Sequence, residues 1–343
     1  MRVISPFRLI TILLLLLPAG IFYSLISGAV AIPVGEAWYA FAGALTGASS
    51  NDQYSIILFN IRLPRILLAL GLGAVLATTG AVMQGLFRNP LADPSLIGVS
   101  SGASVGASLV IVMASSMLQF VTPFGLTLVA VGAFGGGFVA TLLVYRLATT
   151  SAGTSVATML LAGIAISALA GALNSLLSYF ADNDMLRQIS LWQMGNLSTA
   201  NWPRVGLIAA VVVLLGICFP RDSRALNAML LGESEARHLG IDVQRVKARL
   251  IVLTALGVGV SVAVAGLVAF VGLVVPHVIR LLIGPDHRWL LPGSAIAGAL
   301  LMLVADNIAR TIVLPAELPT GIITALLGAP FFVALLVQQR VRL

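Results

Sequence analysis

Three arginines beside apolar runs are the residues whose chemistry suggests a partner. Arg62 and Arg65 flank Pro64 at the start of one apolar run, and Arg310 lies near the end of another. An exposed guanidinium pairs bidentately with a carboxylate, so these side chains could dock acidic residues of a second protein. Asp306 lies four residues before Arg310, which on a helix places both on one face and predicts an internal ion pair instead. The residues alone leave both interpretations open.

The polar segment 220–249 holds a second group of reactive side chains. Two helix-forming stretches, 225–231 and 233–239, are each followed by a glycine, the residue that favours the left-handed turn closing a helix. Such a hairpin predicts a surface that docks in the groove of a partner, and a hairpin lying on lipid is the alternative. The residues expected to form this surface are Leu231, Gly232, Glu233, Glu235, Arg237, Leu239 and Gly240.

Two breaks in the apolar pattern predict irregular backbone. Residues 88–94 contain two prolines and an asparagine, which predicts a short rigid loop that could close a pore at the base of a helix bundle. Gly272 and Pro276 interrupt the apolar run 266–280 and predict a broken helix. Irregular backbone at membrane depth is tolerated where it is buried in protein or lines a cavity, so this segment is expected to border a pathway. His277 beside it is interpreted as a structural hydrogen-bonding residue rather than a ligand.

The motifs that the chain lacks exclude several enzyme classes. It has no Gly-x-x-x-x-Gly-Lys-Ser/Thr phosphate loop, and its single lysine, Lys247, lies in a Val-Lys-Ala context. The chain is therefore not expected to hydrolyse ATP by a Walker-type site. It also lacks Gly-x-Ser-x-Gly and His-Glu-x-x-His. With one cysteine, Cys218, and three distant histidines, no metal site and no cofactor bound by this chain are expected.

Amino-acid composition indicates which kind of secondary structure must hold these residues in place. Hydrophobic residues make up 59% of the chain and charged residues 9%, against about 25% charged in soluble proteins. The 19 basic residues are scattered between apolar runs, which favours membrane topology over a nucleic-acid partner. We therefore expect an all-α membrane protein with membrane lipid as its surroundings.

About ten transmembrane helices are expected from apolar runs of the length that crosses a bilayer. Residues 1–343 are interpreted as one transmembrane domain with both termini on one side. Most basic residues of the short loops fall on the side of the N-terminus, which predicts that both termini are cytoplasmic in a multi-pass inner-membrane protein. The expected spans are 9–31, 63–86, 96–114, 123–145, 155–178, 203–219, 250–268, 269–284, 290–309 and 320–338.

Motifs along residues 55–340 resemble the FecCD-type permeases of ATP-binding-cassette (ABC) importers, a family of BtuC-like type II permeases that includes HmuU-like haem permeases. One short motif would be weak, but this many in the same order are specific. The landmarks are Arg62-Leu63-Pro64-Arg65, Arg88-Asn89-Pro90-Leu91-Ala92-Asp93-Pro94, Leu191-Trp192, Leu231-Gly232-Glu233, Leu239-Gly240, Pro276-His277, Asp286-His287-Arg288, Asp306 with Arg310, and Glu317-Leu318-Pro319.

The resemblance implies a homodimer with the translocation path between its subunits. Two copies of a cytoplasmic ABC ATPase, which would carry ATP-Mg, are expected to bind segment 220–240 as coupling helices, and a periplasmic substrate-binding protein is expected to dock on Arg62, Arg65 and Arg310. Asn89 and Leu91 match one cytoplasmic gate, and Ser155, Val156 and Ala157 match a second. Val156 and Ala157 depart from the Ser/Thr-rich pattern of this second gate, which puts its role in doubt. Gly272, Pro276 and His277 are expected to line the path.

The cargo is the least determined part of the prediction. The resemblance favours an iron chelate, with haem first and a ferric siderophore second, and cobalamin is the alternative. A proton-coupled secondary transporter would need ionisable residues at mid-membrane, and the acid within a predicted span, Asp306, has Arg310 beside it. A membrane scaffold without transport activity predicts that loss of segment 220–240 leaves function intact.

Overall fold

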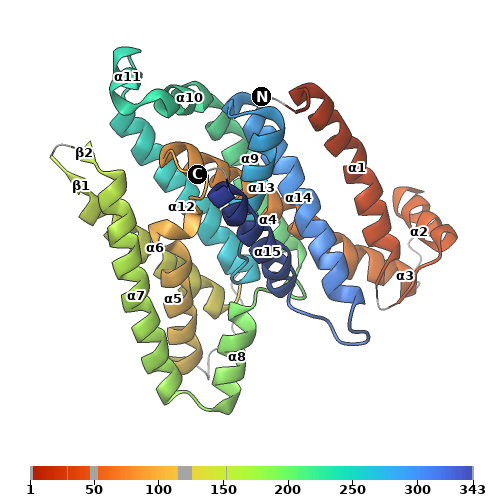
Figure 1. The fold of residues 1–343 in the computed structure, drawn as a ribbon. Coiled ribbons are helices and arrows are strands. Elements are labelled where there is room, and N and C mark those ends of the chain that lie inside the picture. The colour runs from red at the N-terminus through yellow and green to blue at the C-terminus, as the bar shows by residue number, and fades with distance from the viewer. Residues whose placement is uncertain (1–2, 29, 47–52, 115–125, 152, 342–343) are drawn as a thin grey trace.

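The computed structural model describes residues 3–28, 30–46, 53–114, 126–151 and 153–341, and these residues form a helical bundle (Figure 1). Within them, seven helical segments are long and apolar enough to cross a membrane, and three shorter apolar helices accompany them. A helix therefore occupies each of the ten expected spans, while residues 29 and 123–125 of those spans lie outside the described ranges. The ten are α1 (Pro6–Ile26), α4 (Leu63–Leu86), α5 (Val99–Met113), α6 (Leu128–Ala148), α7 (Val156–Phe180), α9 (Trp202–Arg221), α12 (Val243–Ala265), α13 (Val271–Ile283), α14 (His287–Thr311) and α15 (Thr320–Val341).

Shorter elements mark the two ends of the bundle. Those at one end are η2 (Pro94–Ile97), α10 (Ser223–Leu231), α11 (Glu233–His238) and the strands β1 (Thr149–Thr150) and β2 (Gly153–Thr154). The opposite end carries α2 (Val34–Thr46), α3 (Gln53–Ile56), the π-helical turn η1 (Ile57–Arg62) and α8 (Asn183–Gln193). We name the end with α10 and α11 the inner end, following the orientation predicted from the basic residues, and the other the outer end (Figure 1).

Helix α4 forms the centre of the bundle because its glycines let neighbouring backbones approach. A Cβ on Gly73 would lie 2.1 Å from the carbonyl oxygen of Gly298 in α14, and a Cβ on Gly80 would lie 1.8 Å from that of Gly272 in α13. Small residues of this kind allow the close packing that drives helix association in lipid. The α3–α4 segment is accordingly 72% buried over its most apolar window.

Helices α5 and α6 pair through a second set of glycines. Gly102 and Gly106 face the backbones of Gly136 and Gly132, and a Cβ on Gly106 would lie 2.0 Å from the Gly132 carbonyl oxygen. Glycines four residues apart on α5 therefore let the two helix backbones come into direct contact. Gly98, the next glycine in that series, instead has a φ of 82° and links η2 to α5.

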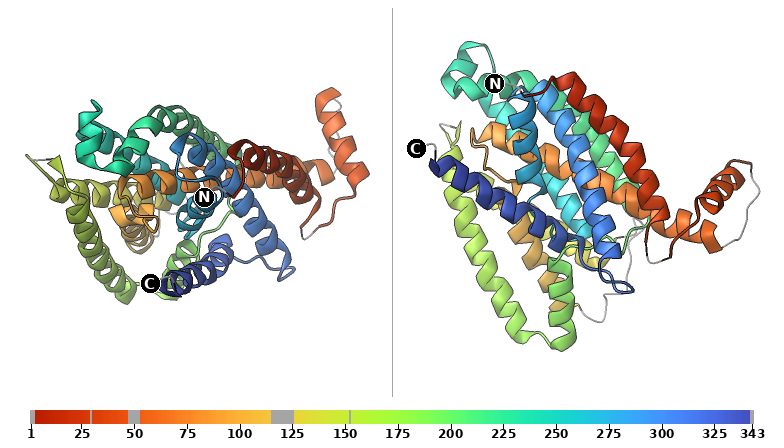
Figure 2. Two further views of the ribbon diagram at one scale, coloured as in Figure 1. Left: turned by 45° about the horizontal axis from the view of Figure 1, so that its top comes forward. Right: turned by 45° about the vertical axis from the view of Figure 1, so that its right-hand side comes forward.

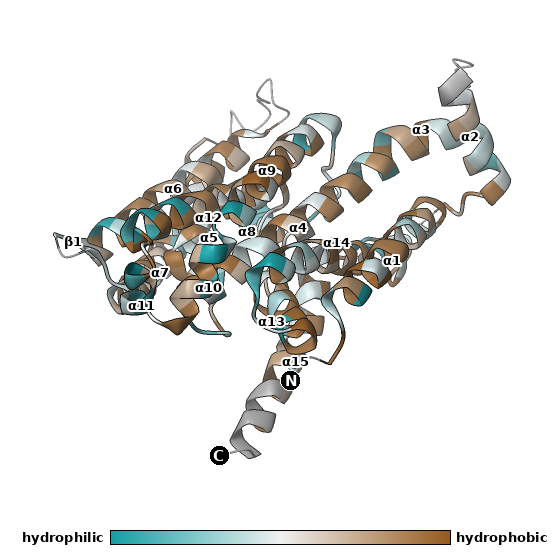
Figure 3. Cartoon of the chain, turned by 90° about the horizontal axis from the view of Figure 1, so that it is seen from above, coloured by the Kyte–Doolittle hydropathy of each residue, from teal (hydrophilic) through white to brown (hydrophobic). Residues whose placement is uncertain are grey.

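Helices α1 and α7 lie at the margins of the bundle and remain largely uncovered (Figure 2). Only 17% of the most apolar window of α1 and 22% of that of α7 are buried. Their exposed side chains are leucine, isoleucine and phenylalanine, which requires lipid or another apolar surface to cover them. Hydrophilic segments gather instead at α10 and α11 (Figure 3).

Helix α8 lies in the outer connection between α7 and α9. It begins at the N-cap Asp182, whose Oδ1 accepts from the backbone N–H of Met185 at 2.8 Å. The connection does not lie flat, because α8 turns back from the end of α7 and packs against α5 (Figure 1). Gln193 at its end donates to Ser104 Oγ of α5 at 3.2 Å.

Candidate functional site

The loop between α4 and α5 is built as a rigid turn at the inner end. Arg88 has a φ of 49°, which reverses the chain after α4. Asn89 Oδ1 then accepts from the Leu91 N–H at 2.9 Å, and Asp93 Oδ1 accepts from the Ser95 N–H at 2.8 Å to cap η2. Burial raises the pKa of the Asp93 carboxyl, while its hydrogen bonds to Ser95 act in the opposite direction. The side chain of Asn89 is exposed, so the expected gate residue lies at the inner surface.

The helix break expected at Gly272 and Pro276 exists, but the sequence prediction of its position was wrong. Helix α12 ends at Ala265, and Gly266 and Phe270 both have positive φ, 73° and 68°, so the irregular segment is 266–270. Gly272 and Pro276 lie inside α13 instead. Proline has no N–H to donate to the carbonyl of Gly272, four residues earlier. That carbonyl lies instead at the close approach to α4, so Pro276 is tolerated inside the helix.

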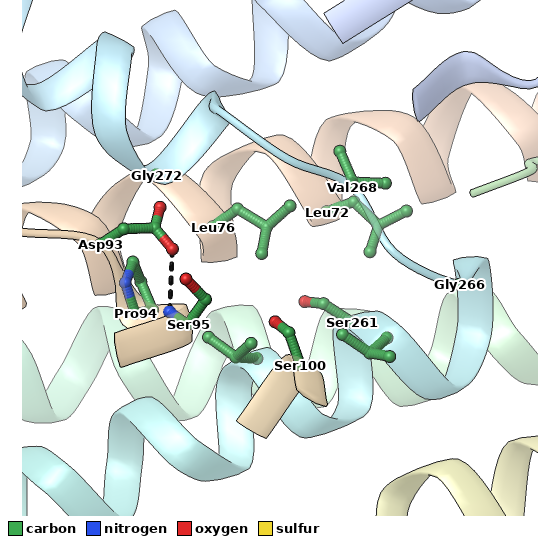
Figure 4. Close-up of a pocket in the computed structure, with 12 residues that line it drawn as sticks. Leu72, Leu76, Asp93, Pro94, Ser95, Ser100, Ser261, Gly266, Val268 and Gly272 are labelled. Carbon is green, nitrogen blue, oxygen red and sulfur yellow. Dashed lines mark hydrogen bonds between the residues drawn. The ribbon is translucent and has the colours of Figure 1, made fainter. Parts of the chain in front are cut away.

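The irregular segment borders two neighbouring hollows, which share several lining residues. A cavity of about 30 Å³ lies between α4, η2, α12 and α13, and the hydroxyls of Ser100 and Ser261 point into it beside the Asp93 carboxylate (Figure 4). That volume is enough for about two water molecules, since one needs roughly 10–15 Å³. A larger hollow of about 310 Å³ shares Asp93, Ser95 and Ser100 and is closed on its other side by residues 267–270 and Leu273.

Of the three expected pathway residues, Gly272 lines the small cavity. His277 is 6% exposed and hydrogen-bonds the backbone of Pro90, which joins α13 to the gate loop and fits the structural role predicted for it. Sequence reasoning missed Asp93, Ser95, Ser100 and Ser261 as polar lining. The Asp-Pro-Ser run after the loop is a signal for the first two, whereas nothing local distinguishes Ser261 from other small residues in α12.

The second expected gate patch begins α7. Ser155 Oγ accepts from the Thr158 N–H at 3.3 Å as the N-cap, and Ser155 and Ala157 are exposed at the inner end. Helix α7 also packs on η2, where the Leu96 carbonyl oxygen lies 1.9 Å from the position of a Cβ on Gly163. The second expected gate patch therefore begins a helix that packs on η2, the turn that follows the first patch in the chain.

Helices α10 and α11 form the hairpin expected from segment 220–240. Gly232 and Gly240 follow the two helices with φ of 136° and 80°, and a Cβ on Gly240 would meet nothing within 4 Å. Leu231 and Leu239 are 72% and 66% exposed, beside the exposed side chains of Glu235 and Arg237. Exposed leucines rimmed by charges are the anatomy of a protein interface.

Charged contacts within the chain hold the hairpin to α12. Glu233 Oε1 accepts from Lys247 Nζ at 2.6 Å, and Asp222 pairs with Arg249, whose Nε lies 2.9 Å from Asp222 Oδ2. Arg237 Nη2 lies 4.0 Å from Glu233 Oε2, a longer contact. Of the charged side chains predicted to dock a partner, Glu233 is therefore the one whose main contact lies within the chain. The hairpin is thus anchored at its base and open at its tips.

The three outer arginines are buried and bonded within the chain. The exposed fractions of Arg62, Arg65 and Arg310 are 4%, 5% and 4%. Arg65 donates to Asp306 Oδ1 at 2.9 Å and to Glu317 Oε2 at 2.6 Å, and Arg310 Nε lies 3.1 Å from Asp306 Oδ2. The internal ion pair predicted from the spacing of Asp306 and Arg310 is confirmed.

Arg62 and Arg310 also bind the end of α1. Arg62 donates to the carbonyls of Leu25 and Val30, and Arg310 donates to Ser24 Oγ at 2.8 Å and to the Ser27 carbonyl at 3.3 Å. Carbonyls at a helix C-terminus lack intrahelical donors and carry negative partial charge, so guanidinium groups stabilise them. The cluster ties α1, α4 and α14 together at the outer end.

Comparisons with known proteins agree with this architecture. The sequence model of the FecCD transport family matches residues 14–338. The hemin transport system permease protein HmuU of Yersinia pestis is 47% identical over 296 residues, which cover 86% of this chain and 87% of that protein. The cobalamin import system permease protein BtuC of Halobacterium salinarum is 44% identical over 291 residues, or 85% of this chain and 76% of that protein.

A solved structure gives the same fold. An ABC transporter of the metal-chelate type, captured in an inward-facing conformation, superposes with a TM-score of 0.83 at 34% sequence identity, covering 96% of this chain and 99% of that one. Family match, sequence identity and fold all extend over nearly the full length. The chain is therefore a member of the FecCD transport family.

Proposed function

We propose that the chain is the membrane-spanning permease subunit of an ABC importer that carries an iron chelate across the bacterial inner membrane. It would act as a homodimer, with two copies of a separate cytoplasmic ABC ATPase and one periplasmic substrate-binding protein. The supporting relatives are permease subunits of hemin and cobalamin import systems. The single observation that carries the proposal is the inner-end hairpin of α10 and α11, which presents exposed leucines to a partner.

The energy for transport would enter through this hairpin. The sequence contains no phosphate loop, so any ATP-driven motion must come from contact with another chain. A ligand shifts a conformational equilibrium only by its differential affinity for the two states, and here that ligand would be the nucleotide bound to the ATPase. The second candidate, a proton-coupled carrier, is less well supported, because Asp306 is 0% exposed and paired with both Arg65 and Arg310.

Haem is the first candidate for the cargo, followed by a ferric siderophore. The identity with the hemin permease is the support for this order, and the identity with cobalamin permeases supports cobalamin as the alternative. The two hollows beside Asp93 and Ser100 are lined by serine hydroxyls, the Asp93 carboxylate, Phe270 and aliphatic side chains. They lie within one chain, whereas the proposed path for the cargo runs between the two subunits.

Docking of the binding protein at the outer end is proposed to involve Arg62, Arg65 and Arg310. Their guanidinium groups face inward, so a partner's carboxylate has to replace a group that they already bind. Glu317 is the member of the cluster best placed to exchange, because its side chain is 38% exposed while Asp306 is fully buried. Acidic residues on the partner would compete with Glu317 for Arg65.

Reconstitution in liposomes tests the function directly. With the cognate ATPase, the binding protein and ATP, we expect uptake of haem to exceed uptake of a ferric siderophore, and cobalamin to be carried least. Vesicles without the ATPase serve as the control and are expected to show no uptake. Uptake that persists without the ATPase and stops on adding a protonophore would establish the secondary carrier instead.

Valine at both Gly232 and Gly240 is expected to reduce uptake per ATP hydrolysed several-fold. Both glycines have positive φ, a conformation that costs an ordinary residue roughly 1–2 kcal/mol, so the hairpin would lose its shape without any new clash at Gly240. The measurement is the ratio of transport to hydrolysis in the reconstituted complex. Valine at Gly206, a helical position in α9 where a Cβ meets nothing within 4 Å, is the matched control. A normal ratio in the double variant would show that the hairpin is only a tether.

A further inference from the structure

Each half of the inner hairpin has its own polar connection to the bundle. The first runs from Asn227 in the middle of α10 to the start of α14. Asn227 Oδ1 accepts from the His287 backbone N–H at 2.9 Å and lies 2.8 Å from His287 Nδ1. Asn227 Nδ2 donates to Asp286 Oδ1 at 2.7 Å. One amide side chain thus makes three contacts with the first turn of α14.

The His287 ring carries this connection on to α4. It is fully buried, and a Cβ on Gly85 would lie 2.5 Å from its Nε2. Because Asn227 Oδ1 is an amide oxygen and can only accept, the ring must donate from Nδ1, which fixes its orientation. Gly85 lies in the last turn of α4. The residue before it, Gln84, accepts a hydrogen bond at its carbonyl from the Asn89 N–H, at 3.1 Å. The ring therefore abuts the turn from which the first gate patch departs.

The second connection runs from α11 through the chain's single lysine. Lys247 on α12 is 1% exposed, and its Nζ donates to Glu233 Oε1 at 2.6 Å and to the Thr154 carbonyl at 3.0 Å. Gln244, also on α12, accepts from the Thr154 N–H at 2.9 Å. Thr154 directly precedes Ser155, so both polar groups of its backbone are held where the second gate patch begins. A buried ammonium needs such partners, which makes this contact costly to break.

We propose that the two halves of the hairpin are connected separately to the two gate patches. Asn227 and His287 would couple α10 to the turn that carries Asn89 and Leu91, and Lys247 would couple α11 to the start of α7 at Ser155–Ala157. These side chains are positioning residues that touch neither cargo nor nucleotide. The inference rests on the proposed function, because it assigns to each connection a share of the motion that the ATPase supplies.

The physical basis is that each connection consists of buried polar bonds, whereas the two helices of the hairpin join through a single glycine. Buried hydrogen bonds to charged groups are short and directional, and removing one partner leaves the other without a substitute. The two helices meet at Gly232, where a Cβ would find no atom closer than 3.8 Å. A displacement of α10 therefore need not move α11 by the same amount, and each gate patch follows its own helix.

Spin labels across the homodimer test the separation. Arg88→Cys and Thr158→Cys, both exposed positions beside the two gate patches, are labelled in a Cys218→Ser background, and the distance between the two copies is measured by pulsed EPR with and without trapped ATP. We expect ATP to change both distances in the otherwise unaltered complex. Asn227→Ala is expected to abolish the change at position 88 and to keep it at 158, and Lys247→Met to do the reverse.

Two further variants keep the test independent of folding defects. Asn227→Asp combined with Asp286→Asn exchanges the two polar groups at constant charge. It keeps the hydrogen bonds of residue 227 to His287 and to residue 286 and gives up the bond from the Arg288 N–H to Asp286 Oδ1, so it is expected to restore the change at position 88. Glu233→Ala removes the partly exposed partner of Lys247. Like Lys247→Met, it is expected to abolish the ATP-dependent distance change at position 158.

Loss of both changes together in either single variant, or retention of both, overturns the inference of separate connections. Failure of the exchanged pair to restore the change at position 88 overturns the role of the Asn227 hydrogen bonds. Absence of any ATP-dependent change in the unaltered complex would refute the proposed function instead, which distinguishes the two failures.

Discussion

Asp306→Ala is expected to destabilise the folded permease by about 3 kcal/mol, because removing one member of a buried ion pair leaves its partners uncompensated. Asp306 is 0% exposed and pairs with both Arg65 and Arg310. Without it, two buried guanidinium groups repel each other, and only Arg65 keeps a carboxylate, that of Glu317. The measurement is the thermal midpoint of the detergent-solubilised protein, which should fall markedly.

Two controls separate charge from shape at this position. Asp306→Asn keeps an acceptor of the same size and should cost less than alanine. Asp184→Ala removes an exposed carboxylate from α8 and is expected to leave the midpoint unchanged. A midpoint for Asp306→Ala equal to that of the unaltered protein would show that the cluster contributes nothing to the stability of the outer end.

Gly80→Ala is expected to be the most damaging single-methyl change in the centre of the bundle. Its Cβ would lie 1.8 Å from the Gly272 carbonyl oxygen, and a backbone atom cannot rotate away as a side chain can. Helix α13 would have to separate from α4, and overpacking of this kind costs about 3 kcal/mol. Because α13 follows the irregular segment 266–270 beside the two hollows, ATP-dependent uptake should fall with the thermal midpoint.

The matched control is Gly216→Ala in α9, where a Cβ meets nothing within 4 Å. Alanine has the higher helix propensity, so this variant should be neutral or slightly stabilised. If the two alanine variants showed the same midpoint and the same uptake, the tight crossing of α4 and α13 would not be a constraint on the protein.

The sequence predicts the helices of this fold well because their signal is local. Ten apolar runs of spanning length appear as ten helices, and the two glycines of segment 220–240 close two helices as expected. In each case the determining residues lie within one or two helical turns of each other.

The parts that sequence reasoning missed depend on residues far apart in the chain. The arginines at the outer end resemble exposed docking groups, yet Arg65 is paired with residues 241 and 252 positions away. Gly272 and Pro276 have the composition of a helix break, whereas the break falls at Gly266 and Phe270, and Gly266 packs against the backbone of Trp192, far away in the sequence. The docking, coupling and gate assignments themselves stay predictions until the experiments above are done.

The glycine crossings of α4 also determine what kind of motion this protein can make. Where α4 crosses α13 and α14, main chain rests on main chain at two points, Gly80 on Gly272 and Gly73 on Gly298. Leucine side chains that interdigitate would have to change rotamer before one helix could move along another. A contact of backbone on backbone needs less rearrangement over short distances, so these crossings would allow α13 and α14 to shear along α4 as rigid bodies.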